Sequence, residues 1–207
     1  MITASFDVDA QKGFTPLCPD ELPVQDGDKI VDALNEQAKL CDYRVGSKDA
    51  HSKGAIWETS ESKPIYSKVD LPNVDVCWPR HCVIGQDGAQ LLPGLPDVTE
   101  YDYFVWKGIE QYMHPYGACY HDLQNKLSTG VIEFLKSKNV THVIVGGLAT
   151  DFCVKTTAIQ LANAGFKTIV NLSACKGIAK ESISAAIVEM QNNNVLVVDG
   201  FAGWKED

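Results

Sequence analysis

The sequence lacks any apolar run close to the ~20 residues with which a helix crosses a bilayer. It also lacks a C-x-x-C pair, and its seven cysteines are odd in number. The first absence argues against a membrane-spanning chain, and the second against a disulfide framework. We therefore expect reduced cysteines and a cytoplasmic location.

Basic side chains are in deficit, with 18 Lys and Arg against 27 Asp and Glu and a formal net charge of −9. This acidic balance argues against nucleic acid or an anionic membrane as the main partner. The first nine residues hold no basic side chain and already include two aspartates, which is not typical of a signal peptide.

What the chain does have is an alternation of short apolar stretches with helical patterns. Its 207 residues, 45% of them hydrophobic, are typical of a globular chain, and we expect one domain over residues 1–207. Strands are predicted at 2–8, 43–48, 103–106, 140–145, 168–172 and 195–198, and helices at 30–41, 130–138, 151–164 and 180–191. This alternation indicates an α/β fold with a parallel sheet buried on both faces.

Chemically capable residues follow four of the predicted strands. In open parallel sheets, ligands bind beyond the carboxyl ends of the strands. The residues at these ends are Asp9, Asp49 with His51, Lys107, and the segment 146–153 that ends at Cys153. Residues 50–99 are irregular, and such a long stretch inside a compact domain is usually functional.

Cys153 is the candidate nucleophile, because it lies where a buried strand gives way to a helix. A thiol in the first helical turn faces unpaired N–H groups and the positive end of the helix dipole, which favour the thiolate. The same N–H groups can bind a developing oxyanion. An inert buried cysteine is the alternative interpretation of this segment.

Asp9 is the candidate general base, which would take the thiol proton and give it to a leaving amine. Asp7 competes for this role, because side chains two residues apart on a strand point the same way. Lys107 is the cation expected to lower the thiol pKa and to keep Asp9 ionised. Taken singly, Asp9 would be better explained as a helix cap or surface turn, and Lys107 as a solvated helix or strand end.

Asp49 and His51 form a candidate metal site, because an extended backbone points them to the same side. With His81 they make a set of two histidines and one aspartate, which suits Zn²⁺, Mn²⁺ or Fe²⁺ and leaves open positions. His114 is not part of a comparable sequence motif with other metal-ligating residues. His142, inside an apolar stretch, is predicted to pack in the core.

Five segments together resemble the nicotinamidase branch of the isochorismatase-like cysteine hydrolases, and the similarity runs from residue 4 to about residue 198. They are residues 9–14 (DAQKGF), 49–51 (DAH), 78–82 (WPRHC), 105–108 (VWKG) and 147–154 (GLATDFCV). The resemblance implies a three-layer α/β/α architecture around a doubly wound, six-stranded parallel sheet. It also implies a catalytic triad of Asp9, Lys107 and Cys153.

The resemblance extends to the surroundings of the triad. It implies an oxyanion hole made by the backbone N–H groups of Ala149 and Cys153, and a cis peptide bond before Ala149. One divalent metal is implied, zinc being expected and Fe²⁺ or Mn²⁺ the alternatives. The implied metal ligands are Asp49, His51 and His81, and the implied substrate-binding residues are Phe14, Trp78 and Tyr116.

Two departures from the family pattern stand out. Many relatives have Y-S-x-F after the lysine, whereas residues 116–119 here read YGAC, so the pocket wall beside Tyr116 differs. A fourth protein ligand varies among relatives, and Glu58 and Glu61 are the candidates here, with water as the alternative.

The function that the resemblance implies is hydrolysis of nicotinamide to nicotinate and ammonia, through a thioester on Cys153, in NAD salvage. Pyrazinamide is an expected analogue, and a homo-oligomer is an expected assembly. Loss of Asp49 should mainly raise KM. The alternatives are a metal-free cysteine amidohydrolase acting on a carbamoyl or ureido substrate and a non-catalytic small-molecule binding module.

Overall fold

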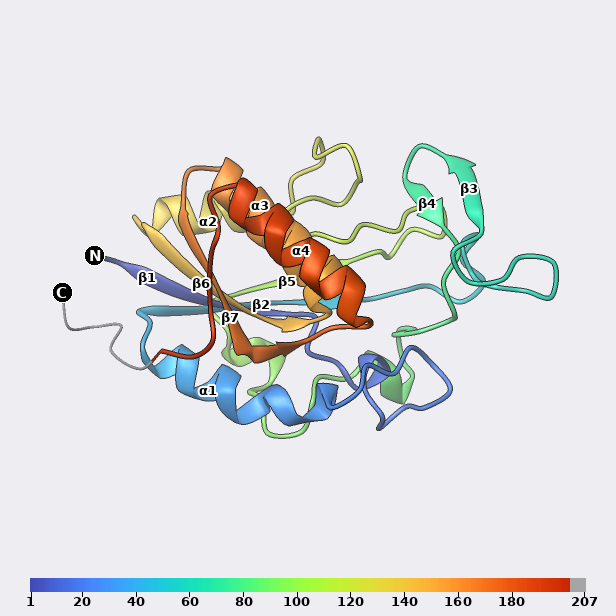
Figure 1. Ribbon diagram of the computed structural model, residues 1–207, viewed down its shortest axis with the longest axis horizontal. Coiled ribbons are helices and arrows are strands. Elements are labelled where there is room, and N and C mark those ends of the chain that lie inside the picture. The colour runs from blue at the N-terminus through green and yellow to red at the C-terminus, as the bar shows by residue number, and fades with distance from the viewer. Residues whose placement is uncertain (202–207) are drawn as a thin grey trace.

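A six-stranded parallel sheet forms the centre of the computed structural model, which describes residues 1–201 (Figure 1). The strand order is β5-β2-β1-β6-β7-β8. The strands are β1 (Thr3–Val8), β2 (Tyr43–Asp49), β5 (Tyr103–Lys107), β6 (His142–Leu148), β7 (Lys167–Lys176) and β8 (Leu196–Val198). The predicted parallel α/β fold is therefore confirmed. The last six residues of the expected domain, 202–207, lie outside the described part.

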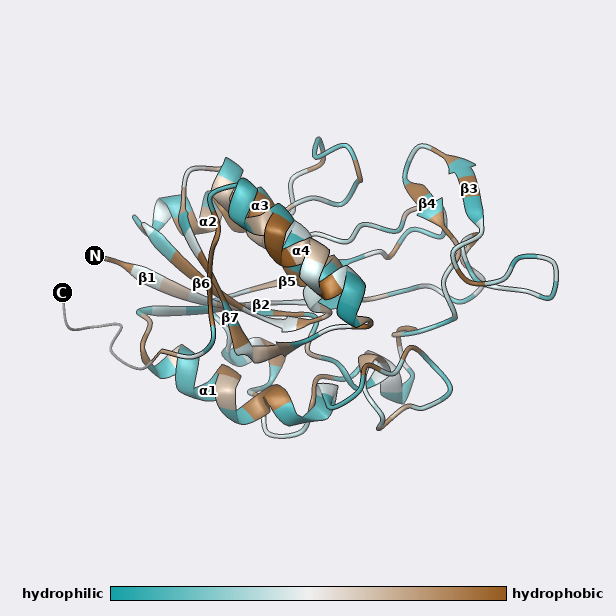
Figure 2. Ribbon diagram, viewed as in Figure 1, coloured by the Kyte–Doolittle hydropathy of each residue, from teal (hydrophilic) through white to brown (hydrophobic). Residues whose placement is uncertain are grey.

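Helices cover both faces of this sheet and complete three layers. The helix α1 (Val31–Lys39) lies on one face, and α2 (Val131–Ser137), α3 (Lys155–Asn163) and α4 (Lys180–Asn192) lie on the other (Figure 1). Two separate apolar clusters result, one that holds Leu34 beneath the sheet and one that holds Leu161 above it. The central strand β6 is apolar along nearly its whole length (Figure 2), as burial on both faces requires. Among residues 1–201, no helix combines the length and apolarity needed to cross a membrane.

One histidine differs from its sequence-based prediction. His142 is the first residue of β6 and is partly exposed, and its Nδ1 lies 2.8 Å from the Thr141 hydroxyl. The prediction that it packs in the core is wrong, because the strand begins two residues later than its apolar pattern suggests. The side chain therefore lies at the rim of the sheet.

The irregular stretch after β2 contains a small hairpin that the sequence did not predict. Its strands, β3 (Lys68–Leu71) and β4 (Val74–Val76), pair antiparallel and project beyond one end of the main sheet (Figure 1). The short 3₁₀ turns η3 (Asp87–Ala89) and η4 (Val98–Glu100) follow.

The order of the strands indicates at which point along the sheet edge a ligand is expected to bind. The chain winds outward from β1 through β2 to β5, returns to β6 beside β1, and then winds the other way through β7 to β8. Beyond the carboxyl ends of the strands, such a reversal leaves a crevice where ligands bind. Here the loops that carry Trp78, His81 and Tyr116 wall that crevice.

Candidate active site

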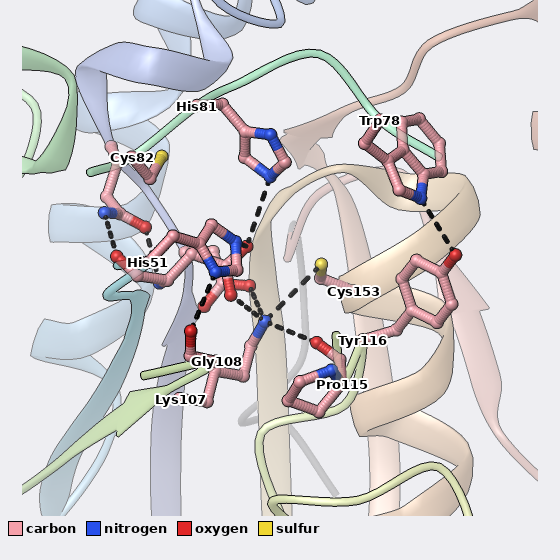
Figure 3. Close-up of polar contacts among 12 residues, drawn as sticks. His51, Trp78, His81, Cys82, Lys107, Gly108, Pro115, Tyr116 and Cys153 are labelled. Atoms are coloured by element: carbon pink, nitrogen blue, oxygen red, sulfur yellow. Dashed lines mark hydrogen bonds and ion pairs between the residues drawn. The ribbon is translucent and has the colours of Figure 1, made fainter. Parts of the chain in front are cut away.

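The three predicted catalytic side chains meet beyond the strand ends. Lys107 Nζ lies 2.9 Å from Asp9 Oδ2 and 3.8 Å from the Cys153 Sγ (Figure 3). Asp9 and Lys107 are fully buried, and Cys153 is 6% exposed. Residues from three distant parts of the chain are thus brought together, as the resemblance implied.

Asp9 is held in place by the end of the neighbouring strand. It follows β1 directly with a φ of 46°, and its N–H donates to the Ser47 carbonyl at 3.1 Å. The Ser47 hydroxyl donates to Asp9 Oδ1 at 2.7 Å. The left-handed turn separates Asp9 from Asp7, whose carboxylate instead accepts hydrogen bonds from Arg44 at 2.7 and 2.9 Å. Of the two competing aspartates, the structure places Asp9 beside Cys153.

Lys107 is surrounded by acceptors on three sides. Its ammonium donates to Asp49 Oδ1 at 2.5 Å and to the Pro115 carbonyl at 3.2 Å, in addition to its contacts with Asp9 and Cys153. In Figure 3 the dashed lines converge on this one nitrogen. Two carboxylates therefore share a single ammonium in a buried site.

This shared ammonium separates the pKa values of the two carboxyl groups. Burial raises the pKa of Asp9, an effect that Lys107 offsets only in part and that Asp49 reinforces. Burial acts on Asp49 too, but Lys107 and His51 together hold its pKa well below the ordinary value. Burial alone would lower the pKa of Lys107, yet the two carboxylates raise it well above its usual range. Asp9 is accordingly the member of this group best suited to gain and lose a proton.

The protonation of Cys153 differs from its prediction. Burial raises the pKa of the thiol well above its usual value, and Lys107 offsets this only in part while Asp9 raises the pKa further. The expectation of a resting thiolate is therefore wrong, because burial and the nearby carboxylates outweigh the ammonium. As a protonated thiol, this candidate nucleophile would need a base at the moment of attack.

The turn that carries Cys153 has the predicted backbone. The peptide bond between Leu148 and Ala149 is cis, as the resemblance implied, and a π-helical turn, η5 (Thr150–Val154), leads into α3. Within this turn Asp151 points away to the loop before α4, where it accepts a hydrogen bond from Ser182 at 2.5 Å and others from the N–H groups of Ile178. Asp151 therefore anchors the start of α4 and the loop before it, which carries Ile178.

The predicted metal ligands also lie together. Asp49 Oδ2 is 3.4 Å from His51 Nε2 and 3.9 Å from His81 Nε2. The Nδ1 atom of each histidine lies within hydrogen-bond distance of a backbone carbonyl oxygen. His51 Nδ1 is 3.0 Å from the Gly108 oxygen, and His81 Nδ1 is 2.6 Å from the Pro79 oxygen. These contacts favour the tautomer whose Nε2 lone pair is free for a metal.

A third histidine joins this group, although the sequence suggested that it stood alone. His114 is 4% exposed, and one ligand atom each from His51, His81 and His114 lie within 4.8 Å of one another. Its pattern gave no signal, because it belongs to the irregular segment after β5 and only the fold brings it to the other two. Trp57, also missed, packs edge-on against His51 and His114, with ring centroids 4.5 Å away in both cases.

The donor set fits a divalent cation. His51 Nε2 and both nitrogens of His114 are buried and make no hydrogen bond among the described residues. Burial and His51 lower the pKa of His81 to about 3, and burial puts that of His114 well below its usual value, so both rings are neutral at physiological pH. Neutral imidazoles beside a carboxylate are the ligands that Zn²⁺ and Fe²⁺ prefer.

The two glutamates proposed as a further ligand lie elsewhere. Glu58 accepts hydrogen bonds from Arg80 at 2.6 and 2.9 Å and from the Gly54 N–H at 2.9 Å. Glu61 is exposed. Neither belongs to the group of histidines that could hold an ion.

A pocket of about 310 Å³, the space at its mouth included, opens onto both groups. The three predicted substrate-binding residues, Phe14, Trp78 and Tyr116, all line it, together with His114, Ala149 and Cys153. Leu22, Phe152 and Ile178 also line it and were not predicted. The walls are thus mainly apolar and aromatic, with the thiol and the histidines as polar points.

Tyr116 ties two walls of this pocket together. Its hydroxyl accepts a hydrogen bond from Trp78 Nε1 at 3.0 Å and donates one to Asp75 Oδ1 at 2.8 Å. The neighbouring departure from the family pattern has a steric reason. A Cβ added at Gly117 would meet Gln160, whose Oε1 accepts the Cys119 N–H at 3.1 Å.

Comparison with known proteins gives a consistent picture. Residues 76–200 match the isochorismatase domain family. A nicotinamidase of Acinetobacter baylyi is 32% identical over 202 residues, which cover 92% of each chain.

Solved structures with the same fold agree. A nicotinamidase/pyrazinamidase of Acinetobacter baumanii has a TM-score of 0.86 at 32% identity and covers 95% of each chain. The yeast nicotinamidase bound to the inhibitor nicotinaldehyde has a TM-score of 0.84 at 28% identity, with 96% of this chain and 100% of that one covered. A pyrazinamidase of Pyrococcus horikoshii in complex with zinc has a TM-score of 0.77 at 27% identity, with 97% and 100% covered.

Proposed function

Since the chain belongs to the isochorismatase family and to its nicotinamidase branch, we propose that it hydrolyses nicotinamide to nicotinate and ammonia through a thioester on Cys153. One observation carries this proposal. A single aromatic pocket is lined by a thiol, a carboxylate and two histidines, and a buried ammonium, a second carboxylate and a third histidine lie beside them. A ring-bearing amide is the substrate that uses both the flat walls and the nucleophile.

The first half of the reaction uses Asp9 as a base and then as an acid. The Cys153 sulfur attacks the carboxamide carbon while its proton passes to Asp9, which lies within 4.8 Å. The carbonyl oxygen becomes an oxyanion, which the backbone N–H groups of Ala149 and Cys153, two residues of the pocket lining, would bind. Asp9 then returns the proton to the amide nitrogen, the C–N bond breaks, and ammonia leaves.

The second half reverses the proton path. Water adds to the thioester carbon and gives a proton to Asp9, and the C–S bond then breaks as the sulfur takes that proton back. Nicotinic acid leaves and loses its own proton to solvent. Lys107 keeps its charge throughout, since both carboxylates raise its pKa, and so stabilises Asp9 whenever that residue is ionised.

Asp49, His51 and His81 would hold a divalent cation, and zinc is the first choice, with Fe²⁺ and Mn²⁺ as alternatives. When bound, such an ion supplies a Lewis-acid position for the ring nitrogen of the substrate. Zinc in the Pyrococcus horikoshii pyrazinamidase supports this choice. Phe14 and Trp78 would then hold the ring from its two sides.

Two other functions are less well supported. If the protein were a metal-free amidohydrolase for a carbamoyl or ureido substrate, the buried histidine nitrogens that make no hydrogen bond would have no binding partner. A non-catalytic binding module leaves unexplained why a base and an ammonium are buried beside a thiol.

Ammonia release from nicotinamide tests the proposal. The wild-type protein should release ammonia, a chelator should lower the rate, and added Zn²⁺ or Fe²⁺ should restore it. Cys153→Ala should bind substrate with no turnover. The matched control is Cys119→Ala, another buried cysteine, which lies outside the pocket lining and should keep the activity.

Each alternative predicts a different result. Turnover of ureido compounds but not of nicotinamide would favour the metal-free amidohydrolase. Tight nicotinamide binding without ammonia release by the wild type would favour the binding module. Pyrazinamide should be accepted as well, because it keeps a ring nitrogen and a carboxamide.

A single domain over residues 1–207, a cytoplasmic location and self-association remain predictions from the sequence. We propose a small-molecule substrate as the partner, with no role for nucleic acid or membrane. Size-exclusion chromatography with light scattering would measure the assembly.

A further inference from the structure

We propose that His114 is a protein ligand of the divalent cation, in addition to the three residues that the family motifs supply. This inference rests on the metal-dependent function proposed above. It assigns a role to a residue that the D-x-H and W-P-x-H-C motifs do not contain.

The first observation is the state of the His114 ring. It is 4% exposed and lines the pocket, yet neither of its nitrogens makes a hydrogen bond among residues 1–201. A buried polar atom without a partner is costly, and the cost of such an atom is often offset by a ligand. Two unpartnered nitrogens on one ring point to a ligand rather than to packing.

The second observation is convergence. A nitrogen of His114 lies within 4.8 Å of the ligand nitrogens of His51 and His81. The ring stacks on that of His51 at an interplanar angle of 16° and a centroid distance of 5.3 Å, and it meets His81 edge-on at 5.7 Å. Two ligands that bind one ion at about 2.0–2.1 Å lie at most about 4.2 Å apart, so small side-chain shifts bring these nitrogens within reach of one shared ion.

The third observation is that the backbone fixes the position of the ring. The His114 N–H donates to the Asn73 carbonyl at 2.8 Å, in the turn of the β3–β4 hairpin. The carbonyls on either side, of Met113 and Pro115, accept hydrogen bonds from Trp57 Nε1 at 3.2 Å and Lys107 Nζ at 3.2 Å. Three consecutive residues are thus tied to three separate parts of the site.

The number of protein ligands sets the coordination of the ion. Three histidines and Asp49 would fill a four-coordinate site and leave no position for substrate. We therefore expect five or six ligands in total, which Fe²⁺ and Co²⁺ take readily and which zinc reaches by expansion. Removal of His114 should lower both the affinity and the coordination number.

Co²⁺ binding to the chelator-treated, full-length protein tests this directly, because the visible absorption of Co²⁺ reports the number of its ligands. His114→Phe keeps a flat ring and removes both nitrogens, and His114→Gln is a polar second variant. Both should raise the Kd for Co²⁺ by about 100-fold or more and change the absorption spectrum, since even residues that only support a ligand change affinity 10–100-fold. His121→Phe is the matched control and should bind as the wild type does.

Circular dichroism and thermal unfolding of the metal-free variants separate lost ligation from lost folding. If both folded His114 variants match the wild type in Kd and spectrum, while His81→Ala binds weakly, the role of His114 is overturned and the proposed metal site stands. If the wild type binds no Co²⁺, or His81→Ala binds it equally well, both proposals fall. If only His114→Phe is misfolded, His114→Gln decides.

Discussion

Lys107 donates a 2.5 Å hydrogen bond to Asp49. This contact joins the candidate catalytic residues to the cluster of histidines. The other oxygen of the same carboxylate lies 3.4 Å from His51 Nε2. One aspartate therefore acts on both parts of the site. Its two oxygens face an ammonium on one side and a proposed cation on the other.

Asp49→Ala should lower kcat as well as raise KM. Loss of the carboxylate removes one of the two anions that hold Lys107, so we expect a fall in kcat of about 10²-fold. Loss of a metal contact should raise KM about tenfold or more. The sequence alone predicted an effect mainly on KM. Steady-state kinetics with nicotinamide decide, and an unchanged kcat would contradict the coupling.

Asp9→Asn should abolish turnover without destabilising the fold. The amide cannot accept the thiol proton, and removal of a general base typically lowers kcat by about 10²–10⁴-fold. Ammonia release measures this loss. A residual activity near that of the wild type would assign the base to another residue.

The stability of the same variant follows from linkage. The pKa of Asp9 is raised in the folded state, so the folded state binds its proton more tightly, and this residue destabilises the protein at pH values above its folded pKa. Asparagine removes that buried charge, while Lys107 keeps its pair with Asp49. We expect Tm at pH 7 to be equal to or higher than that of the wild type, as measured by calorimetry.

The pH dependence of thiol alkylation tests the protonation of Cys153. Since burial raises its pKa, the thiolate fraction is small at pH 7 and grows only as the pH exceeds the ordinary thiol range. Iodoacetamide should therefore react slowly at pH 7 and progressively faster above pH 9, as followed by mass spectrometry. A rate that is already at its plateau at pH 7 would indicate a resting thiolate.

Catalysis should weaken on the acid side. Asp9 must be ionised to act as the base, and its raised pKa places the acid limb of kcat/KM above the ordinary aspartate range of about pH 4. A profile of kcat/KM against pH, with metal in excess, measures this limb. A limb at or below pH 4 would contradict the burial of Asp9 as its cause.

Tyr116→Phe should mainly raise KM. The change removes the acceptor of Trp78 Nε1 and the donor to Asp75, so the aromatic wall loses its support. A typical hydrogen bond contributes about 0.5–1.5 kcal/mol, which corresponds to a rise in KM of about 2- to 10-fold per bond. The matched control, Tyr120→Phe, changes a tyrosine outside the pocket lining and should leave KM unchanged.

Asp151→Ala should destabilise the fold. Its carboxylate accepts hydrogen bonds from Ser182 and from the N–H groups of Ile178 and Ala179, all at the start of α4. Hydrogen bonds to a charged group contribute about 1.5–3 kcal/mol each, so we expect a loss of at least about 3 kcal/mol in the free energy of unfolding. Urea unfolding measures it, and Ser182→Ala should cost clearly less.

Much of this site could be predicted from the sequence because its motifs sit at strand ends. Asp9 follows β1 directly, Asp49 and Lys107 are the last residues of β2 and β5, and the carboxyl ends of parallel strands meet at one edge of a sheet. Cys153, the proposed nucleophile, lies in the π-helical turn that comes after β6. The regular alternation of apolar strands and helices therefore predicted both the fold class and which side chains lie near the Cys153 thiol.

The rest depended on contacts that no local pattern encodes. His114 lies in an irregular segment, and three hydrogen bonds to distant residues hold that segment beside His51. The raised pKa of Cys153 results from burial and from the sum of several charges, which its place in the sequence does not reveal. The amino-acid sequence by itself determined the parallel sheet and the order of the reactive groups along its edge, because periodicity is local. Only the tertiary structure decided that His114 joins the other two histidines and which acid holds the proton, because packing, solvation and charge are set by all the neighbours at once.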